Sequence, residues 1–305
     1  MVYILSAWLA VASAAPTGAL QASVPYDSTR TQVVMLGTGN PNPDPDRSGP
    51  ATAVVVRGRA YLVDAGPGVV RRAAAAARAG VAALRTENLK TVFLTHLHSD
   101  HTLGLPDLML SPWVLSRTAP LAVYGPRGTR TLTRHLLEAY AADIDNRRRG
   151  AQPHNDTGWR AQAHEIRPGV VYRDDAVTVI AFPVPHAGWR EAYGYRFETP
   201  DRTIVISGDT RPDDAVVRAC DGCDVLVHEV YSQEGFDRLP PEWQRYHAGA
   251  HTSAVALGVL AARARPKLLV LTHGLPWSST PAEIVREVRA GFDGAVAYAS
   301  DLDIY

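Results

Sequence analysis

This sequence of 305 residues has no excess of charge of either sign, because Lys plus Arg and Asp plus Glu both number 31. A net charge of zero excludes a global electrostatic field that would steer the protein toward nucleic acid or an anionic membrane. An anionic substrate would therefore have to be held locally, and a bound metal is the most direct means of holding it.

Cysteine is also scarce. Cys220 and Cys223 form a single Cys-x-x-Cys pair, and no second pair exists to complete a structural zinc site. Redox catalysis is one reading of such a pair. We expect instead either small side chains entering a buried strand or an incidental disulfide.

Long apolar runs are missing beyond the first segment. Residues 1–22 contain no Lys, Arg, Asp or Glu, and their apolar run over 2–15 is too short to span a bilayer comfortably. The small residues that follow resemble a signal-peptide cleavage site after Ala22. We expect export to the periplasm or the medium, with no stable membrane anchor. If 1–22 is an ordinary apolar extension, as its lack of basic residues would allow, the protein is cytoplasmic.

Beyond this segment, short β-branched runs alternate with helical patterns, and no internal repeat or Ser/Gly linker divides the chain. We therefore expect one domain over 23–305, of the α/β (α+β) class, with sheets covered by helices. A Pro-rich loop is expected at 40–46 and a polar loop at 143–158. Strands are predicted at 32–36, 51–56, 61–63, 91–95, 121–124, 177–184, 193–198, 203–207, 224–228, 267–272 and 295–299. Helices are predicted at 69–83, 129–140, 213–219, 252–263 and 281–290.

Four potential metal ligands lie within six residues, directly after the apolar strand at 91–95: His96, His98, Asp100 and His101. In an extended segment His96 and His98 point to the same side, so both can reach one ion. The chain then turns, which places Asp100 and His101 toward a neighbouring ion. Such a dense cluster is most easily stabilised by a cation.

This segment resembles the His-x-His-x-Asp-His signature of the metallo-β-lactamase superfamily, and the rest of that ligand set follows at the ends of β-branched runs, in His186, Asp209 and His273. The resemblance implies the αββα sandwich of the metallo-β-lactamase fold and two metal ions. It gives one ion to His96, His98 and His186. It gives the other to Asp100, His101 and His273, with Asp209 between them. Nitrogen and oxygen donors without a thiolate suit two Zn²⁺, with Mn²⁺ or Fe as alternatives.

Later segments resemble the ribonuclease Z-like branch of this superfamily. The strand Asp224-Val225-Leu226-Val227-His228-Glu229 precedes Gly249-Ala250-His251-Thr252-Ser253, which is similar to a Gly-His-Ser-Thr segment although Gly is displaced and Thr-Ser is reversed. The resemblance implies that His251 protonates the leaving oxygen, that Glu229 orients His251, and that Asp100 orients a metal-bridging hydroxide. Asp64, in an Asp-x-Gly segment, would support the ligands from outside.

The function implied is that of a binuclear metal-dependent hydrolase, a ribonuclease Z-like phosphodiesterase acting on small or cyclic phosphodiesters or on exposed RNA ends. RNA remains a possible substrate, but the basic arm of tRNA-processing members is absent between His186 and Asp209, which weakens the case for tRNA maturation. The branch also implies a possible homodimer.

A secreted arylsulfatase acting on a small-molecule sulfate ester is the main alternative. A β-lactamase is less expected because Asp209 is present, and a lactonase has no separate support. A non-catalytic metal-binding module conflicts with the completeness of the motifs. Several aromatic residues could form an apolar wall for the substrate, with ordinary packing as the alternative for most of them: Trp159, Trp189, Tyr231, Trp243 and Trp277.

Overall fold

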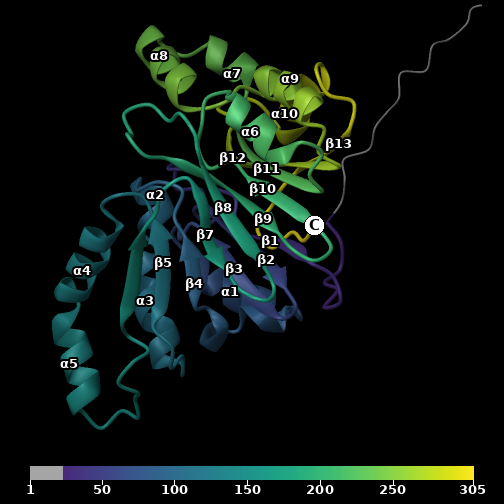
Figure 1. Cartoon of the computed structure of the whole chain (residues 1–305). Coiled ribbons are helices and arrows are strands. Elements are labelled where there is room, and N and C mark those ends of the chain that lie inside the picture. Colours follow the sequence, from purple (N-terminus) through teal and green to yellow (C-terminus); the bar gives the residue numbers. More distant parts are fainter. Residues whose placement is uncertain (1–22) are drawn as a thin grey trace, which may run out of the picture.

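The computed structural model describes residues 23–305, and two β-sheets form its centre (Figure 1). The first sheet has the strand order β1 (Gln32–Gly37), β2 (Ala51–Val56), β3 (Arg59–Val63), β4 (Thr91–Phe93), β5 (Leu121–Gly125), β6 (Ala161–Glu165). The second has the order β13 (Ala295–Tyr298), β12 (Leu268–Leu275), β11 (Val225–Tyr231), β10 (Thr203–Ile206), β9 (Tyr193–Glu198), β8 (Thr178–Pro183), β7 (Gly169–Arg173). The expected export signal at 1–22 lies outside the described residues.

Alternation along the strands makes the two sheets face each other. In β1, Val33 and Met35 join a hydrophobic cluster that also contains residues of the second sheet, whereas Val34 joins the cluster on the opposite face. In β11, Val227 joins the same central cluster and Leu226 points to the other side. Because successive side chains of a strand point to opposite faces, each strand contributes to a central layer and to an outer one.

Helices cover both outer faces, which gives the expected αββα sandwich. On the first sheet lie α1 (Val69–Arg78) and α3 (Leu105–Val114), followed in the chain by α4 (Thr129–Ala139) and α5 (Ala141–Arg149). On the second lie α6 (Asp214–Cys220), α9 (Ala254–Ala264) and α10 (Pro281–Arg289). The remaining elements are α2 (Ser99–Thr102), α7 (Gln233–Asp237), α8 (Pro241–Ala250) and two short 3₁₀ turns at Ala82–Leu84 and Thr86–Asn88.

Several predicted elements differ from those in the structure. The predicted helix at 69–83 ends at Arg78, because Gly80 adopts a positive φ of 112° and turns the chain. The loop predicted at 143–158 is helical up to Arg149, since Asp143–Arg147 and Asp145–Arg149 ion pairs at i,i+4 support α5. Strands β6 and β7 were missed because their side chains are mostly exposed and carry little apolar alternation.

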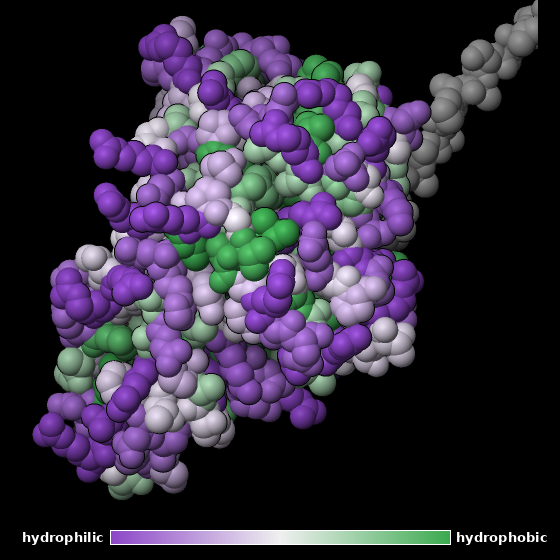
Figure 2. All heavy atoms as spheres, in the orientation of Figure 1, coloured by the Kyte–Doolittle hydropathy of each residue, from purple (hydrophilic) through white to green (hydrophobic). Residues whose placement is uncertain are grey.

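The disulfide between Cys220 and Cys223 is present, and it joins the end of α6 to the start of β11. Among residues 23–305, no helix combines the length and the apolar character needed to cross a bilayer. The face shown in Figure 2 is mostly hydrophilic, with a group of hydrophobic side chains near its middle, over β7 and β8.

Candidate metal centre

All seven side chains predicted as metal ligands meet at one edge of the sandwich, where strands end. His96 and His98 follow β4, His186 follows β8, Asp209 follows β10, and His273 lies in β12. Strands β10, β11 and β12 run parallel, so the chain leaves β10 and reaches His273 at the same edge of the second sheet. The two sheets thus supply ligands from opposite sides of the centre.

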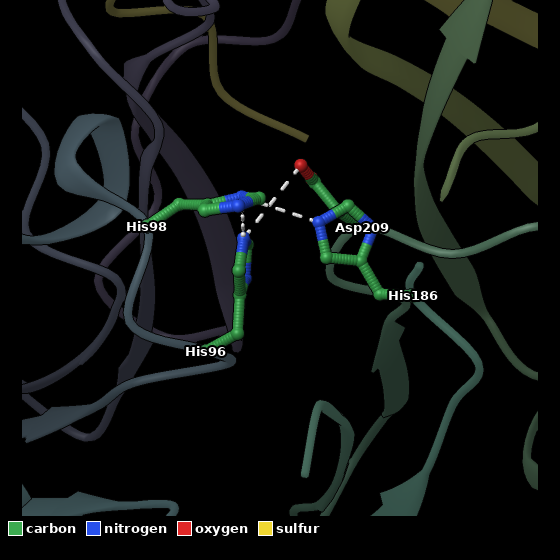
Figure 3. Close-up of side chains that lie close together, drawn as sticks. All are labelled: His96, His98, His186 and Asp209. Atoms are coloured by element: carbon green, nitrogen blue, oxygen red, sulfur yellow. Dashed lines mark hydrogen bonds and ion pairs between the residues drawn. The ribbon is translucent and has the colours of Figure 1, made fainter. Parts of the chain in front are cut away.

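One group of ligand atoms comes from His96, His98, His186 and Asp209 (Figure 3). The Nε2 atom of His96 lies 2.9 Å from Nδ1 of His98, and Nε2 of His186 lies 3.2 Å from the same atom. Asp209 Oδ2 is 3.9 Å from His96 Nε2. Three imidazoles and a carboxylate oxygen therefore surround one small volume, which is the donor set of a nitrogen- and oxygen-ligated metal site.

A second group contains Asp100, His101 and His273, and Asp209 adjoins it as well. Asp100 Oδ2 is 3.2 Å from His273 Nε2 and 3.5 Å from His101 Nε2. The Oδ2 atom of Asp209 lies 3.4 Å from His101 Nε2 and 3.5 Å from His273 Nε2. The same Asp209 oxygen therefore faces both groups, as a bridging carboxylate would.

Hydrogen bonds on the far side of three imidazoles decide which nitrogen faces the centre. Nδ1 of His186 donates to the carbonyl oxygen of Ala250 at 2.7 Å, and Nδ1 of His101 donates to Asp64 Oδ2 at 2.8 Å. Nδ1 of His96 lies 3.0 Å from the hydroxyl of Thr95. When Nδ1 carries the proton, Nε2 presents its lone pair to the centre, which is the arrangement that metal-bound histidines adopt. The residues present therefore fit divalent cations.

Buried charge leads to the same conclusion. Burial lowers the pKa of His96 well below its ordinary value, and it also lowers that of His186, so both rings are neutral and able to bind metal. Burial would raise the pKa of Asp209, but His273 and His101 hold it well below the ordinary value. Burial would lower the pKa of His101, yet the carboxylates of Asp209 and Asp64 raise it well above its ordinary value. A cation at this position would balance the same carboxylates.

His273 reaches the centre through an irregularity in β12. Glu229 pairs with Thr272 and Val230 pairs with Gly274, so His273 is an extra residue in the register, and its φ is 46°. Such bulges redirect a side chain at the end of a ladder. The next residue, Gly274, has no room for a side chain, because an added Cβ there would lie 2.0 Å from the Tyr298 hydroxyl.

His251 and Glu229 lie beside the second group of ligands. Nδ1 of His251 is 3.5 Å from Glu229 Oε2 and 3.9 Å from Asp209 Oδ2, and His251 and Glu229 are both buried. The other carboxylate oxygen, Glu229 Oε1, accepts the backbone N–H of Thr252 at 2.8 Å, which holds Glu229 in place. Burial would lower the pKa of His251, but Glu229 raises it above the ordinary value, which favours a ring that can donate a proton.

The five predicted aromatic residues have different surroundings. The ring of Trp189 lies 5.2 Å from that of His98, whereas Trp159 packs against the cluster outside the first sheet. Trp243 and Trp277 line a pocket beside His251, and the ring of Tyr231 lies 5.8 Å from that of Trp277.

The sequence pattern did not indicate two further aromatic side chains of this pocket, Tyr246 and His247. Their signal was the aromatic-rich spacing of helix α8, in which His247 stands four residues before His251. Nor did it identify the carbonyl of Ala250 as the partner of His186, because a backbone acceptor leaves no mark in the residue types.

Comparison with known proteins agrees with this geometry. The sequence profile described as a beta-lactamase superfamily domain matches residues 59–274. Ribonuclease Z of Mycobacterium sp. (strain KMS) is 37% identical over 247 residues, which cover 80% of this chain and 84% of that protein. Ribonuclease Z of Mycobacterium bovis (strain BCG / Pasteur 1173P2) is 36% identical over 278 residues, which cover 89% and 96%.

Solved structures share the fold. The short form of human tRNase Z superimposes with a TM-score of 0.68 at 23% identity, covering 90% of this chain and 98% of that one. The metallo-beta-lactamase fold protein YhfI from Bacillus subtilis superimposes with a TM-score of 0.69 at 17% identity, with the same coverage of 90% and 98%.

Proposed function

This chain belongs to the β-lactamase superfamily and, within it, to the ribonuclease Z group, and we propose that it works with two zinc ions. It is a metal-dependent hydrolase of phosphodiester bonds. His96, His98 and His186 would hold one ion, and Asp100, His101 and His273 the other, with Asp209 shared. The observation that supports this most directly is that Asp209 Oδ2 faces both groups of ligands. Mn²⁺ or Fe would be accepted by the same donors.

When bound, two such ions activate water and stabilise the negative charge that develops on the phosphate oxygens. The remaining tasks fall to side chains of this chain. Asp100 orients the attacking water by accepting its hydrogen bond. Glu229, whose Oε2 lies 3.5 Å from Nδ1 of His251, would orient that ring so that His251 gives a proton to the leaving oxygen as the phosphorus–oxygen bond breaks.

We propose that the substrate is a small phosphodiester or an exposed RNA end rather than a folded tRNA. Between His186 and Asp209 the chain forms the short strands β9 and β10 and their turns. A basic arm for tRNA is therefore missing at this place, and the net charge of zero provides no substitute.

The direct test is kcat/KM of the zinc- or manganese-loaded protein on bis(p-nitrophenyl) phosphate and on p-nitrophenyl sulfate, with Asp209→Ala as the blank. We expect the phosphodiester to be strongly preferred and the blank to be inactive on both. Preference for the sulfate would replace this proposal by the arylsulfatase, which the relatives do not favour.

We also propose that the protein is exported after cleavage following Ala22. A Cys220–Cys223 disulfide supports this, because disulfides persist in oxidising compartments. N-terminal sequencing of the protein from the extracytoplasmic fraction should begin at Ser23. A protein that keeps Met1–Ala22 and stays in the cytoplasm would contradict export.

A further inference from the structure

A pocket of about 780 Å³ opens beside the metal centre and extends to His251 and His273. The rest of its lining includes Leu239, Trp243, Tyr246 and Trp277, none of which has a role in the mechanism above. Helix α8, which carries two of these rings, lies at the top of Figure 1, at the opposite end of the molecule from α4 and α5. On its other sides the pocket is lined by Trp277 and by Leu275 and His273 of β12.

The lining is mostly aromatic and aliphatic, and its polar side chains are Asn42, Tyr246 and three histidines. Among residues 23–305, no Lys, Arg, Asp or Glu lines the pocket. A groove that follows a nucleic-acid backbone uses cationic side chains to contact successive phosphates. This pocket offers ring faces instead, so the group that it suits is flat and uncharged.

The rings form a connected series that ends at the proposed proton donor. Trp243 stacks on His247 with ring centroids 5.8 Å apart, and His247 lies 5.5 Å from His251. Trp277 lies 5.1 Å from His247 on another side. Trp243 and Tyr246 nevertheless remain 53% and 40% exposed, so part of each ring is free for another ring to contact.

The opposite side of the pocket is held in an unusual backbone conformation. Trp277 has a φ of 46°, in the left-handed region that residues with a Cβ seldom adopt, and an added Cβ at Gly235 would lie 2.9 Å from the Trp277 ring. Strained conformations of this kind persist where the surrounding structure holds them, and they are concentrated at functional sites. Glu287 contributes by accepting the N–H groups of Gln233 and Glu234, at 2.8 and 2.9 Å, which anchors α7.

We propose that this pocket binds the aromatic ring of the substrate's leaving group, so that the substrates are phosphodiesters with a flat, uncharged ring a few atoms from phosphorus. The ring belongs to the leaving side because His251, which protonates the leaving oxygen, lines the pocket. A nucleobase and a simple aryl group share this chemistry. This inference rests on the proposed phosphodiesterase for the position of the phosphate, whereas ring binding can be measured without turnover.

The test compares ligands that have the same anionic head with and without a ring. Calorimetric titration of the zinc-loaded protein with 3-phenylpropylphosphonate and propylphosphonate should show that the phenyl compound binds roughly tenfold to a hundredfold more tightly, the range for one stacked ring. Trp243→Ala and Trp277→Ala should each lose most of that preference while binding propylphosphonate as the wild type does. Trp243→Phe should keep most of it.

Trp159→Ala is the matched control, because Trp159 lies outside the pocket and should leave the preference intact. The affinities for adenosine 5′-monophosphate and ribose 5-phosphate give the same comparison for a nucleobase. This second pair distinguishes nucleotide substrates from simple aryl esters. Equal binding within both ligand pairs would overturn the inference even if the protein hydrolyses phosphodiesters. Ring preference that depends on the tryptophans, in a protein without phosphodiesterase activity, would support the pocket and reject the proposed function.

Discussion

At the scale of single residues, partners outside the metal centre determine what the histidines can do. Asp64, the carbonyl of Ala250 and the Thr95 hydroxyl each contact Nδ1 of an imidazole whose Nε2 faces inward. Asp64 was predicted from the sequence to support the ligands from outside. Its carboxylate also accepts the backbone N–H of Thr95, so it connects β3 to the segment that carries the first ligands.

The proposed proton donor is tested by a dependence on the leaving group. His251→Gln should lower kcat by roughly 10²- to 10⁴-fold for a dinucleotide, whose alkoxide leaving group needs a proton. The loss should be much smaller for bis(p-nitrophenyl) phosphate, because p-nitrophenolate leaves without protonation. Steady-state kinetics on both substrates, with metal content measured for each protein, distinguishes proton donation by His251 from a role in positioning. An equal loss on both substrates would indicate a positional role instead.

His247 should make the folded state sensitive to acid. Burial, and then the neighbouring His251, lowers its pKa to about 4. Because the folded pKa lies below the unfolded value, the stabilisation is complete above the ordinary histidine pKa of about 6.5 and is lost as the pH falls toward 4. As the pH falls from 6.5 toward 4, the free energy of unfolding should therefore decrease less steeply in His247→Phe than in the wild type. The two slopes should differ by up to about 1.4 kcal/mol per pH unit, the limit for one proton.

Urea titrations between pH 7 and pH 4 measure this difference. His135→Phe is measured beside it as a substitution of the same kind at a surface position, because His135 is 59% exposed on α4. If the curve for His247→Phe runs parallel to that of the wild type, His247 is not the source of the acid sensitivity.

At the scale of elements, the short covalent link between α6 and β11 stabilises the strand that carries Glu229. The Cys220–Cys223 disulfide closes a loop of four residues, for which the chain-entropy relation gives about 2 kcal/mol. The double variant Cys220→Ala/Cys223→Ala should be less stable by about that amount in urea unfolding. Reductant should bring the wild type to a similar stability, and a wild type indifferent to reductant would show that the link adds nothing.

At the scale of the whole molecule, the two sheets meet over a cluster of buried imidazoles and carboxylates that bound cations would hold together. Removal of metal by a chelator should lower Tm, and zinc should restore it. The free energy of unfolding should increase by about 4 kcal/mol when the free zinc concentration is a thousandfold above its Kd. Thermal unfolding at stepped zinc concentrations measures this.

Metal analysis of the same samples tests the stoichiometry. We expect two zinc ions per chain in the wild type and at most one in Asp209→Ala, since this carboxylate faces both groups of ligands. One ion per wild-type chain would contradict the binuclear proposal while leaving the fold and the family unchanged.

Much of this molecule could be predicted from its sequence, because the informative signals are local. Strand alternation and the spacing His96-x-His98-x-Asp100-His101 depend on neighbours a few residues apart, and the predicted αββα fold and phosphodiesterase family are confirmed. The ligand assignment and the role of His251 stay predictions. The elements β6, β7 and α5 were not predicted, because most of their side chains are exposed and the apolar periodicity is weak.

The tertiary structure decided the rest. The bulge that turns His273 inward depends on the register between β11 and β12, which no residue type encodes by itself. The tautomer of His186 depends on the backbone carbonyl of Ala250, 64 residues away along the chain. The aromatic pocket needs α8 and Trp277 to lie side by side. Residue types and their spacing thus determined which chemistry is available, whereas backbone partners and long-range packing decided where it is directed.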